Sequence, residues 1–185
     1  MTDILYCDKC PLGIFNNFHP TNGDGQGDIM IIGESPTGTD VKKGKPFAGK
    51  SGKLVRKILQ KYNLTQHCYF TTVIKCKTPY NRTARPTEIS ACKSYLYSEI
   101  FYHKPKIIIL LGTVAMQWAY PNKVIISVNT YSFSQRNFGS TVIGIAYHPS
   151  YILHNPNLLP EYSNFFNNVS TLYAHLNPYY NRPQR

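Results

Sequence analysis

The sequence predicts a single α/β domain in which helices cover both faces of a central, mainly parallel, four-stranded sheet. Two observations predict this fold class. Segments with the apolar spacing of helices alternate with strand-like runs, which is typical of a three-layer α/β/α sandwich. The runs are also almost continuously apolar, as expected of strands buried on both faces. They are residues 28–33 (DIMIIG), 69–74 (YFTTVI), 106–112 (KIIILLG) and 141–146 (TVIGIA).

Helices are expected where apolar residues recur every three to four positions. The segments with this spacing are residues 51–62, 87–102, 113–120 and 161–176. In the second segment, Tyr95, Ile100 and Phe101 are expected to face the core. The stretches rich in Gly, Pro and Asn should be irregular. These are residues 11–27, part of 122–139 and the tail 178–185, which we expect to be flexible.

Length, composition and charge limit the class of protein. The chain has 185 residues, 42% of them hydrophobic, so one core and one domain over residues 1–185 are expected. The net charge of +11 favours a polyanionic partner, with nucleic acid ahead of an anionic membrane. No apolar run approaches the roughly 18 to 20 residues that span a bilayer, and the start of the chain lacks a signal-peptide pattern. We therefore expect a soluble intracellular protein of the cytoplasm or nucleoid, or of the host cytoplasm if the source is viral.

Polar and aromatic side chains follow the ends of the predicted strands, where open parallel sheets bind their ligands. Glu34, Asp40 and Phe47 follow the first strand, Cys76 follows the second and His148 follows the fourth. Their convergence predicts a functional site at this edge of the sheet. Each residue alone also has a structural reading, since such strand exits are commonly tight turns, a Phe suits the core, and a His suits a hydrogen-bonded turn.

Four of the five cysteines are candidates for a shared metal site. Cys7 and Cys10 are separated by two residues, a spacing that lets adjacent thiolates reach one metal centre. Cys76 and Cys92 both follow the second predicted strand. Four thiolates suit either a 4Fe-4S cluster or a tetrahedral zinc ion, and the spacing leaves both open. Cys68, which precedes that strand, is expected to be the free thiol.

Several motifs occur in order along most of the chain. They are residues 33–36 (GESP), 44–52 (GKPFAGKSG), 73–79 (VIKCKTP) with 81–82 (NR), 106–112 (KIIILLG), and 147–151 (YHPSY) with 155–156 (NP). This set resembles the iron-sulfur uracil-DNA glycosylases known as family 4, and more loosely families 5 and 6. The resemblance implies a four-stranded parallel sheet and release of uracil from DNA in base excision repair. It also implies a structural 4Fe-4S cluster, bound by the four cysteines and tying an N-terminal arm, residues 1–27, to the domain.

The same resemblance implies a role for each candidate site residue. The base is flipped out of the DNA, and Phe47 would stack on it. Glu34 and Asp40 would line the sugar and base side of the pocket, one of them positioning or activating water, and His148 would stabilise the departing uracil anion. Residues 150–157 would enter the duplex with two apolar wedges. The implied DNA contacts are Lys50, Ser51, Arg82, Ser150, Tyr151, Leu153 and His154, with Tyr151 and Leu153 as the wedges.

Two positions depart from the family pattern. Asp40 stands where the family usually has Glu, which keeps the charge on a shorter arm. Thr72 stands where the family commonly has Asn, whose amide reads the Watson–Crick edge of uracil, so bidentate recognition is lost. Three functions therefore stay open: a uracil-DNA glycosylase, a glycosylase for another damaged or modified base, and a catalytically weak DNA-binding protein that serves replication. We expect a monomer that binds DNA, with a replication or repair protein as a further partner.

Overall fold

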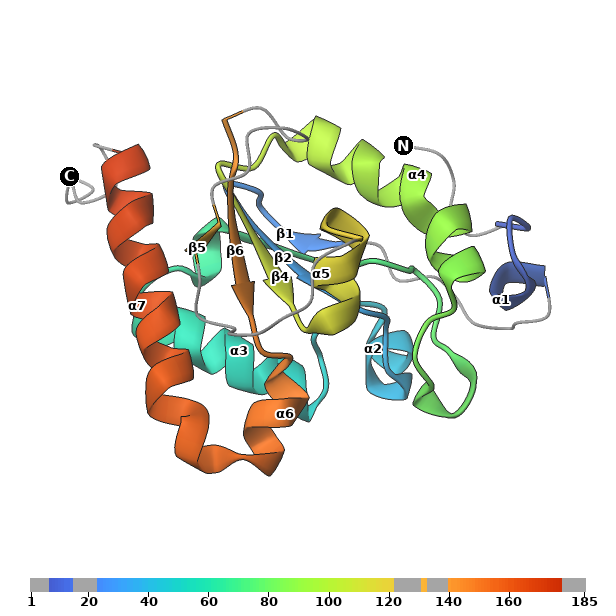
Figure 1. Ribbon diagram of the computed structural model, residues 1–185, viewed down its shortest axis with the longest axis horizontal. Helices are drawn as coiled ribbons and strands as arrows, with labels where there is room; N and C mark the ends of the chain where they lie inside the picture. Colours follow the sequence, from blue (N-terminus) through green and yellow to red (C-terminus); the bar gives the residue numbers. More distant parts are fainter. Residues whose placement is uncertain (1–6, 15–22, 122–130, 133–139, 178–185) are drawn as a thin grey trace.

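The computed structural model describes residues 7–14, 23–121, 131–132 and 140–177, which form a central sheet between two layers of helices (Figure 1). The strand order is β1-β3-β2-β4-β6-β5. The four inner strands run parallel, and the two outer strands, each of two residues, pair antiparallel. The strands are β1 (Asp24–Gly25), β2 (Ile29–Gly33), β3 (Cys68–Thr72), β4 (Ile107–Leu111), β5 (Tyr131–Ser132) and β6 (Val142–Ala146). The expected four-stranded parallel core is confirmed, with two short edge strands added to it.

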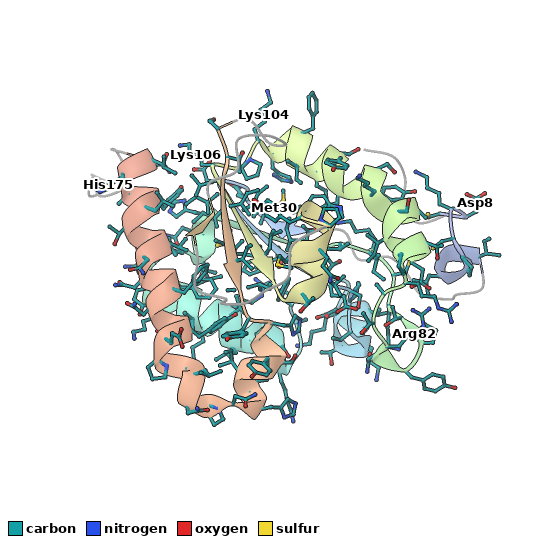
Figure 2. The ribbon with its side chains drawn as sticks, in the orientation of Figure 1. Asp8, Met30, Arg82, Lys104, Lys106 and His175 are labelled. Carbon is teal, nitrogen blue, oxygen red and sulfur yellow. The ribbon has the colours of Figure 1, made fainter. Side chains whose placement is uncertain are left out.

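Helices cover both faces of the sheet, which confirms the three-layer architecture. Ile29 and Ile31 of β2 pack against α3, α6 and α7, whereas Met30 and Ile32 pack against α1, α4 and α5. Successive strand residues point to opposite faces, so a strand covered on both sides is apolar throughout. Met30 accordingly lies in the middle of the molecule in Figure 2. The α-helices are α1 (Pro11–Ile14), α2 (Gly38–Lys43), α3 (Lys50–Lys61), α4 (Pro86–His103), α5 (Thr113–Ala119), α6 (Pro149–His154) and α7 (Leu159–Leu176), and the 3-10 helices are η2 (Thr65–His67), η3 (Pro79–Asn81) and η4 (Pro156–Leu158).

Three local expectations are wrong. Phe101 is 79% exposed, because Ile100 takes the core-facing position and the next residue of a helix lies about 100° around the axis. Residues 11–27 are not wholly irregular, since they include α1 and β1. The second predicted strand, which is β3, ends at Thr72 rather than at Ile74, because the Thr72 hydroxyl donates to the Ile74 carbonyl at 2.7 Å and the chain turns out of the sheet.

All four parallel strands end at one edge of the sheet, and the segments that follow them build the candidate site. Figure 2 places Arg82, which follows β3, on the opposite side of the molecule from Lys104 and Lys106, which precede β4. The predicted tail 178–185 and most of residues 122–139 lie outside the described residues. In the part of the chain that the structure describes, no helix has both the length and the apolar character needed to cross a membrane.

Candidate active site

A cavity of about 220 Å³ opens at the carboxyl edge of the sheet, beside the ends of β2 and β3. It is smaller than the roughly 300 to 1,000 Å³ of clefts that bind drug-sized ligands, so it suits one small heterocycle. The structure brings the five predicted catalytic and base-binding residues together around it: Glu34, Asp40, Phe47, Thr72 and His148. Two predicted DNA contacts, Lys50 and Ser51, line it as well.

Glu34 directly follows β2 and is half-buried. Its Oε1 accepts a hydrogen bond from the backbone N–H of Ala84 at 2.8 Å. Burial raises the pKa of Glu34 above its ordinary value of 4.5, and the Ala84 hydrogen bond opposes this only in part. A carboxylate with a raised pKa at the edge of a pocket is suited to proton transfer.

Asp40 is held more tightly, because both of its carboxylate oxygens accept hydrogen bonds. Oδ2 accepts from the Thr37 amide at 2.7 Å and from the Thr37 hydroxyl at 2.8 Å, and Oδ1 accepts from the Ala48 amide at 2.6 Å. Thr37 and Asp40 thereby form the capping box at the start of α2. Asp40 is 4% exposed, and it joins α2 to the segment that carries Phe47.

Phe47 forms one wall of the cavity in an unusual backbone conformation. Its φ is 57°, in the left-handed region, which is strained for a bulky residue. The ring lies against the end of β2, where a Cβ on Gly33 would stand 2.8 Å from Phe47 Cζ. A Cβ on Gly52 would stand 2.1 Å from the Phe47 carbonyl oxygen. Both glycines therefore leave the space that the Phe47 ring and backbone occupy.

Thr72 ends β3 and is buried at the cavity wall. Its hydroxyl donates to the Ile74 carbonyl at 2.7 Å. A hydroxyl has one proton to donate, so this bond leaves only its acceptor lone pairs for a ligand. The wall at this position therefore presents an acceptor and a methyl group.

His148 caps α6 with its imidazole ring. Nδ1 accepts a hydrogen bond from the Ser150 backbone N–H at 3.3 Å and lies 2.6 Å from the Ser150 hydroxyl. A backbone N–H can only donate, so in the neutral ring Nδ1 carries no proton and Nε2–H is the donor. Burial lowers the pKa of His148 below 6.5, which favours this neutral form.

The other predicted DNA contacts fall into two groups. Tyr151, Leu153 and His154 are exposed on α6, next to His148. Arg82 instead pairs with Glu88 through both guanidinium NH2 groups, Nη1 lying 2.9 Å from Oε2. Its charge is thus used within the protein, where it joins the β3 exit loop to the start of α4.

Four cysteines lie around a second, small and mostly apolar cavity between α1, α4 and the exit of β3. They are the predicted metal ligands Cys7, Cys10, Cys76 and Cys92. Lys75 donates its backbone N–H to Cys92 Sγ at 3.3 Å. Lys9 fastens the arm to α4, since its Nζ donates to the Ser94 hydroxyl at 3.0 Å and stands over the Tyr95 ring. Cys68 lies apart, at the start of β3, with its thiol donating to the Leu64 carbonyl.

Comparison with known proteins decides the family. The sequence model of the uracil DNA glycosylase superfamily matches residues 20–171. The chain belongs to this superfamily. It is 32% identical to the Type-4 uracil-DNA glycosylase of Archaeoglobus fulgidus over 179 residues, which covers 92% of this chain and 89% of the relative. It is 31% identical to the Type-4 uracil-DNA glycosylase of Thermotoga maritima, covering 80% of this chain and 79% of the relative.

A larger protein contains a segment similar to this superfamily member. A DNA polymerase of Bacillus phage SP01 is 29% identical over 163 residues, which cover 84% of this chain but 17% of the polymerase. Most of this chain is thus similar to one segment of a much longer protein.

Sequence reasoning missed several residues that build the candidate site. Thr37 and the Ala84 amide hold the two carboxylates, and Ser35 and Thr39 also line the cavity. The role of Thr37 could have been predicted from the sequence, because Thr-x-x-Asp is a capping-box pattern. No sequence pattern could have predicted the role of Ala84, because it acts through its backbone and lies far from Glu34 in the sequence.

Proposed function

We propose that this protein is a uracil-DNA glycosylase, which hydrolyses the N-glycosidic bond of deoxyuridine in DNA and thereby starts base excision repair. One observation carries the proposal: Glu34, Phe47 and His148 share a cavity of the size of a single heterocycle. The Type-4 uracil-DNA glycosylases to which the chain is similar support the same substrate.

The shape of the cavity implies that the base leaves the duplex before it reacts. A base in a stacked helix cannot enter a cavity between strand ends, so the nucleotide must be flipped. The Phe47 ring then supplies an aromatic face on which the flipped base stacks.

His148 is the group that we assign to the leaving base. The bond between C1′ and the base nitrogen breaks, and its electron pair departs with uracil, so negative charge develops on the base. The Nε2–H of the neutral imidazole is a donor for a carbonyl oxygen of that anion. The Ser150 backbone N–H fixes the tautomer by donating to His148 Nδ1. Ser150, which the resemblance implied as a DNA contact, thus has the role of positioning His148.

Glu34 is the group that we assign to water and sugar. Water adds its oxygen to C1′ and loses a proton, which the Glu34 carboxylate accepts. The same negative charge stabilises the positive charge that develops on the sugar. Asp40 already accepts hydrogen bonds at both oxygens, so we assign it the bracing of the cavity wall rather than proton transfer.

The four cysteines are proposed as the ligands of a 4Fe-4S cluster. They share one cavity, and a backbone N–H reaches the sulfur of Cys92, as is common around cluster thiolates. Among the described residues, no group of three or more His, Cys, Asp or Glu side chains is arranged to hold a single metal ion. The choice of a cluster over zinc rests on the resemblance to the iron-sulfur glycosylases of family 4. When bound, the cluster would cross-link the N-terminal arm, the β3 exit and α4.

The DNA would lie across the cavity mouth. Lys50 and Ser51 line the cavity, and Tyr151, Leu153 and His154 project from α6 beside it. We propose that Tyr151 and Leu153 enter the duplex where the flipped nucleotide leaves it. The net charge of +11 supports attraction to the phosphates.

The test is incubation with single-stranded and duplex oligonucleotides that contain one uracil, followed by alkali. We expect strand scission at the uracil and none in a matched thymine control. Absence of scission across a range of salt and pH would refute the proposal.

A second candidate is a glycosylase for another damaged or modified base. The observation that favours it is the Thr72 hydroxyl, whose proton is used by the Ile74 carbonyl, so this wall offers only an acceptor. Such a wall can accept from the N3–H of uracil but cannot donate to a uracil carbonyl oxygen, so a base that presents only donors to Thr72 would be preferred. A panel of modified oligonucleotides separates the two candidates, because strict uracil preference would exclude the second.

A third candidate is a replication partner without catalysis, favoured by the similarity to a segment of the phage polymerase. Binding to uracil-containing DNA without base release, unaffected by substitution of Glu34 and His148, would support it. Base release by the wild-type protein would exclude it.

A further inference from the structure

The backbone of Phe47 has a strained conformation that other contacts must hold in place. Its φ of 57° is a strained conformation for a bulky residue, and it persists only where the surrounding structure imposes it. Residues 44–49 form the turn between α2 and α3, so no sheet ladder or helix fixes the Phe47 backbone. The neighbouring contacts must therefore supply the constraint.

Arg56, in the second turn of α3, makes two of these contacts, beside the hydrogen bond from the Ala48 amide to Asp40. Its Nε donates to the Phe47 carbonyl at 3.2 Å, and its Nη2 donates to the Pro46 carbonyl at 3.1 Å. Among the described residues no other donor reaches either carbonyl. One planar guanidinium thus binds two successive carbonyls of the strained turn, which fixes the two peptide planes on either side of Phe47.

The guanidinium is itself fixed from two other directions. Its Nη2 is 2.7 Å from Asp24 Oδ2 in β1, and its Cζ stands 3.8 Å from the centre of the Phe70 ring in β3. The Phe70 ring also contacts the Phe47 ring, with centroids 5.7 Å apart and planes tilted by 55°. Arg56 therefore connects the edge of the sheet to both the backbone and the ring of Phe47.

The ion pair alone does not account for this arrangement. The Arg56 and Asp24 side chains are 25% and 33% exposed, and an ion pair of that exposure contributes little to stability. The two hydrogen bonds to carbonyls are directional, and they act on the residue whose ring lines the cavity.

We infer that Arg56 is a positioning residue, which holds Phe47 in its left-handed conformation so that the ring forms the stacking wall for the flipped base. The inference rests on the proposed function for its effect on rate. Its structural half, the dependence of the Phe47 conformation on Arg56, does not need the protein to be a glycosylase.

The experiment compares Arg56→Met, which keeps the apolar stem over Phe70 but loses the donors, with Asp24→Asn, which removes the ion pair but keeps the donors. Arg56→Lys retains charge and one donor. We expect Arg56→Met to lower the single-turnover rate of uracil release by at least about tenfold, since a misplacement of about 1 Å can cost about 100-fold. Asp24→Asn should stay within about twofold of wild type, and Arg56→Lys should recover part of the rate.

A double-substitution cycle with Phe47→Ala separates positioning from general stability. If Arg56 acts through the ring, Arg56→Met should cause little further loss of rate when the ring is already absent. An undiminished loss in the Phe47→Ala background, or an equal loss in Asp24→Asn, would overturn the inference.

Crystal structures of the Arg56→Met and Asp24→Asn variants give a readout independent of activity. We expect Phe47 to leave the left-handed region, and its ring to leave Gly33, only in Arg56→Met. A Phe47 that stays in place without the Arg56 donors would overturn the inference. A Phe47 that moves, in a protein whose wild type releases no uracil, would refute the proposed function alone.

Discussion

At the scale of single residues, the two carboxylates of the cavity differ in how many hydrogen bonds they already accept. Asp40 accepts three, which involve both oxygens. Glu34 accepts one, at Oε1. A carboxylate with an unused oxygen can hold water and take its proton, whereas one saturated by backbone and hydroxyl donors fixes the chain around it. The local hydrogen bonds thus assign the two roles.

The pH dependence of base release should report Glu34. Glu34 can accept a proton from water only when its carboxyl group is deprotonated. The rate of uracil release therefore rises with pH through the Glu34 pKa, which burial places above 4.5. A pH profile of the single-turnover rate should therefore lose activity on the acid side at a higher pH than an exposed carboxylate would give. His148, whose pKa is lowered, stays neutral at pH 7. An acid limb at the ordinary carboxylate pKa would contradict the assignment.

Asp40→Asn should act on stability. An amide has one acceptor oxygen, so it cannot accept from both Thr37 and Ala48. Loss of a buried hydrogen bond of this kind costs about 2 kcal/mol, or about 4–8 °C in Tm for a chain of this size. Thermal unfolding measures the change. An unaltered Tm with activity abolished would instead make Asp40 the base.

The types of the site residues could be predicted from sequence, but their partners could not. Glu34, Phe47 and His148 follow strand ends, which the apolar runs located. The Ala84 amide on Glu34 and the Arg56 guanidinium on Phe47 depend on the folded course of two loops, and no local periodicity encodes it. The same holds for the Thr72 hydroxyl, whose donation to Ile74 is visible only in the structure.

At the scale of elements, the loop from β3 to α4 is fixed where it enters α4. Its end presents the Ala84 amide to Glu34, and Arg82 pairs with Glu88 in the first turn of α4. Glu88 also accepts from the Arg85 backbone N–H at 2.8 Å, which helps to start the helix. The loop is therefore part of the cavity wall, and the start of α4 supports it.

Arg82→Met should lower stability without changing how DNA binding depends on salt. The pKa of Glu88 is lowered, chiefly by its hydrogen bond to Arg82, so its stabilisation is present above its unfolded pKa and is lost as pH falls through the lowered folded pKa. We expect a Tm lower by several degrees at pH 7 and a smaller difference from wild type in acid. Binding titrations at several salt concentrations should give the wild-type slope. If the slope of log K against log salt concentration were smaller by about one in the variant, Arg82 would be a phosphate contact.

The elements themselves could be predicted because their signals are local. The buried runs gave the four parallel strands, and the helical spacing gave α3, α4, α5 and α7. The two-residue strands β1 and β5 could not be predicted, since two residues carry no periodicity. The assignment of Phe101 to the core failed because Phe101 lies about 100° around the axis beyond Ile100, outside the buried face of α4.

At the scale of the whole molecule, the exit of β3 connects the two cavities. Thr72 lines the first and Cys76 the second, with buried Lys75 between them. Lys75 Nζ donates to Glu99 of α4 at 2.6 Å and to the Thr72 carbonyl at 2.9 Å. Separating a buried ion pair of this kind is strongly unfavourable, because removing one partner leaves the other charge buried and uncompensated. The two cavities therefore share the exit of β3 as a common wall.

Cys7→Ala should destabilise the N-terminal arm more than it alters chemistry, since the arm reaches α4 through the proposed cluster. The matched control is Cys68→Ala, which lies outside the cysteine cavity. We expect Cys7→Ala to lose iron and to speed hydrogen exchange in residues 7–14, while Cys68→Ala keeps its iron. Iron analysis with exchange mass spectrometry measures both. Stoichiometric zinc and no iron in the wild type would show that the four cysteines bind zinc instead of a cluster.

The most direct test of the account is the release of free uracil from a uracil-containing oligonucleotide, followed by chromatography for the wild type and for Glu34→Gln. The account predicts that the wild type releases one uracil per oligonucleotide. It predicts that Glu34→Gln, whose amide oxygen can still accept from Ala84, keeps its Tm but is slower by about 10² to 10⁴-fold. No free uracil from the wild type, or equal rates for the two proteins, would contradict it.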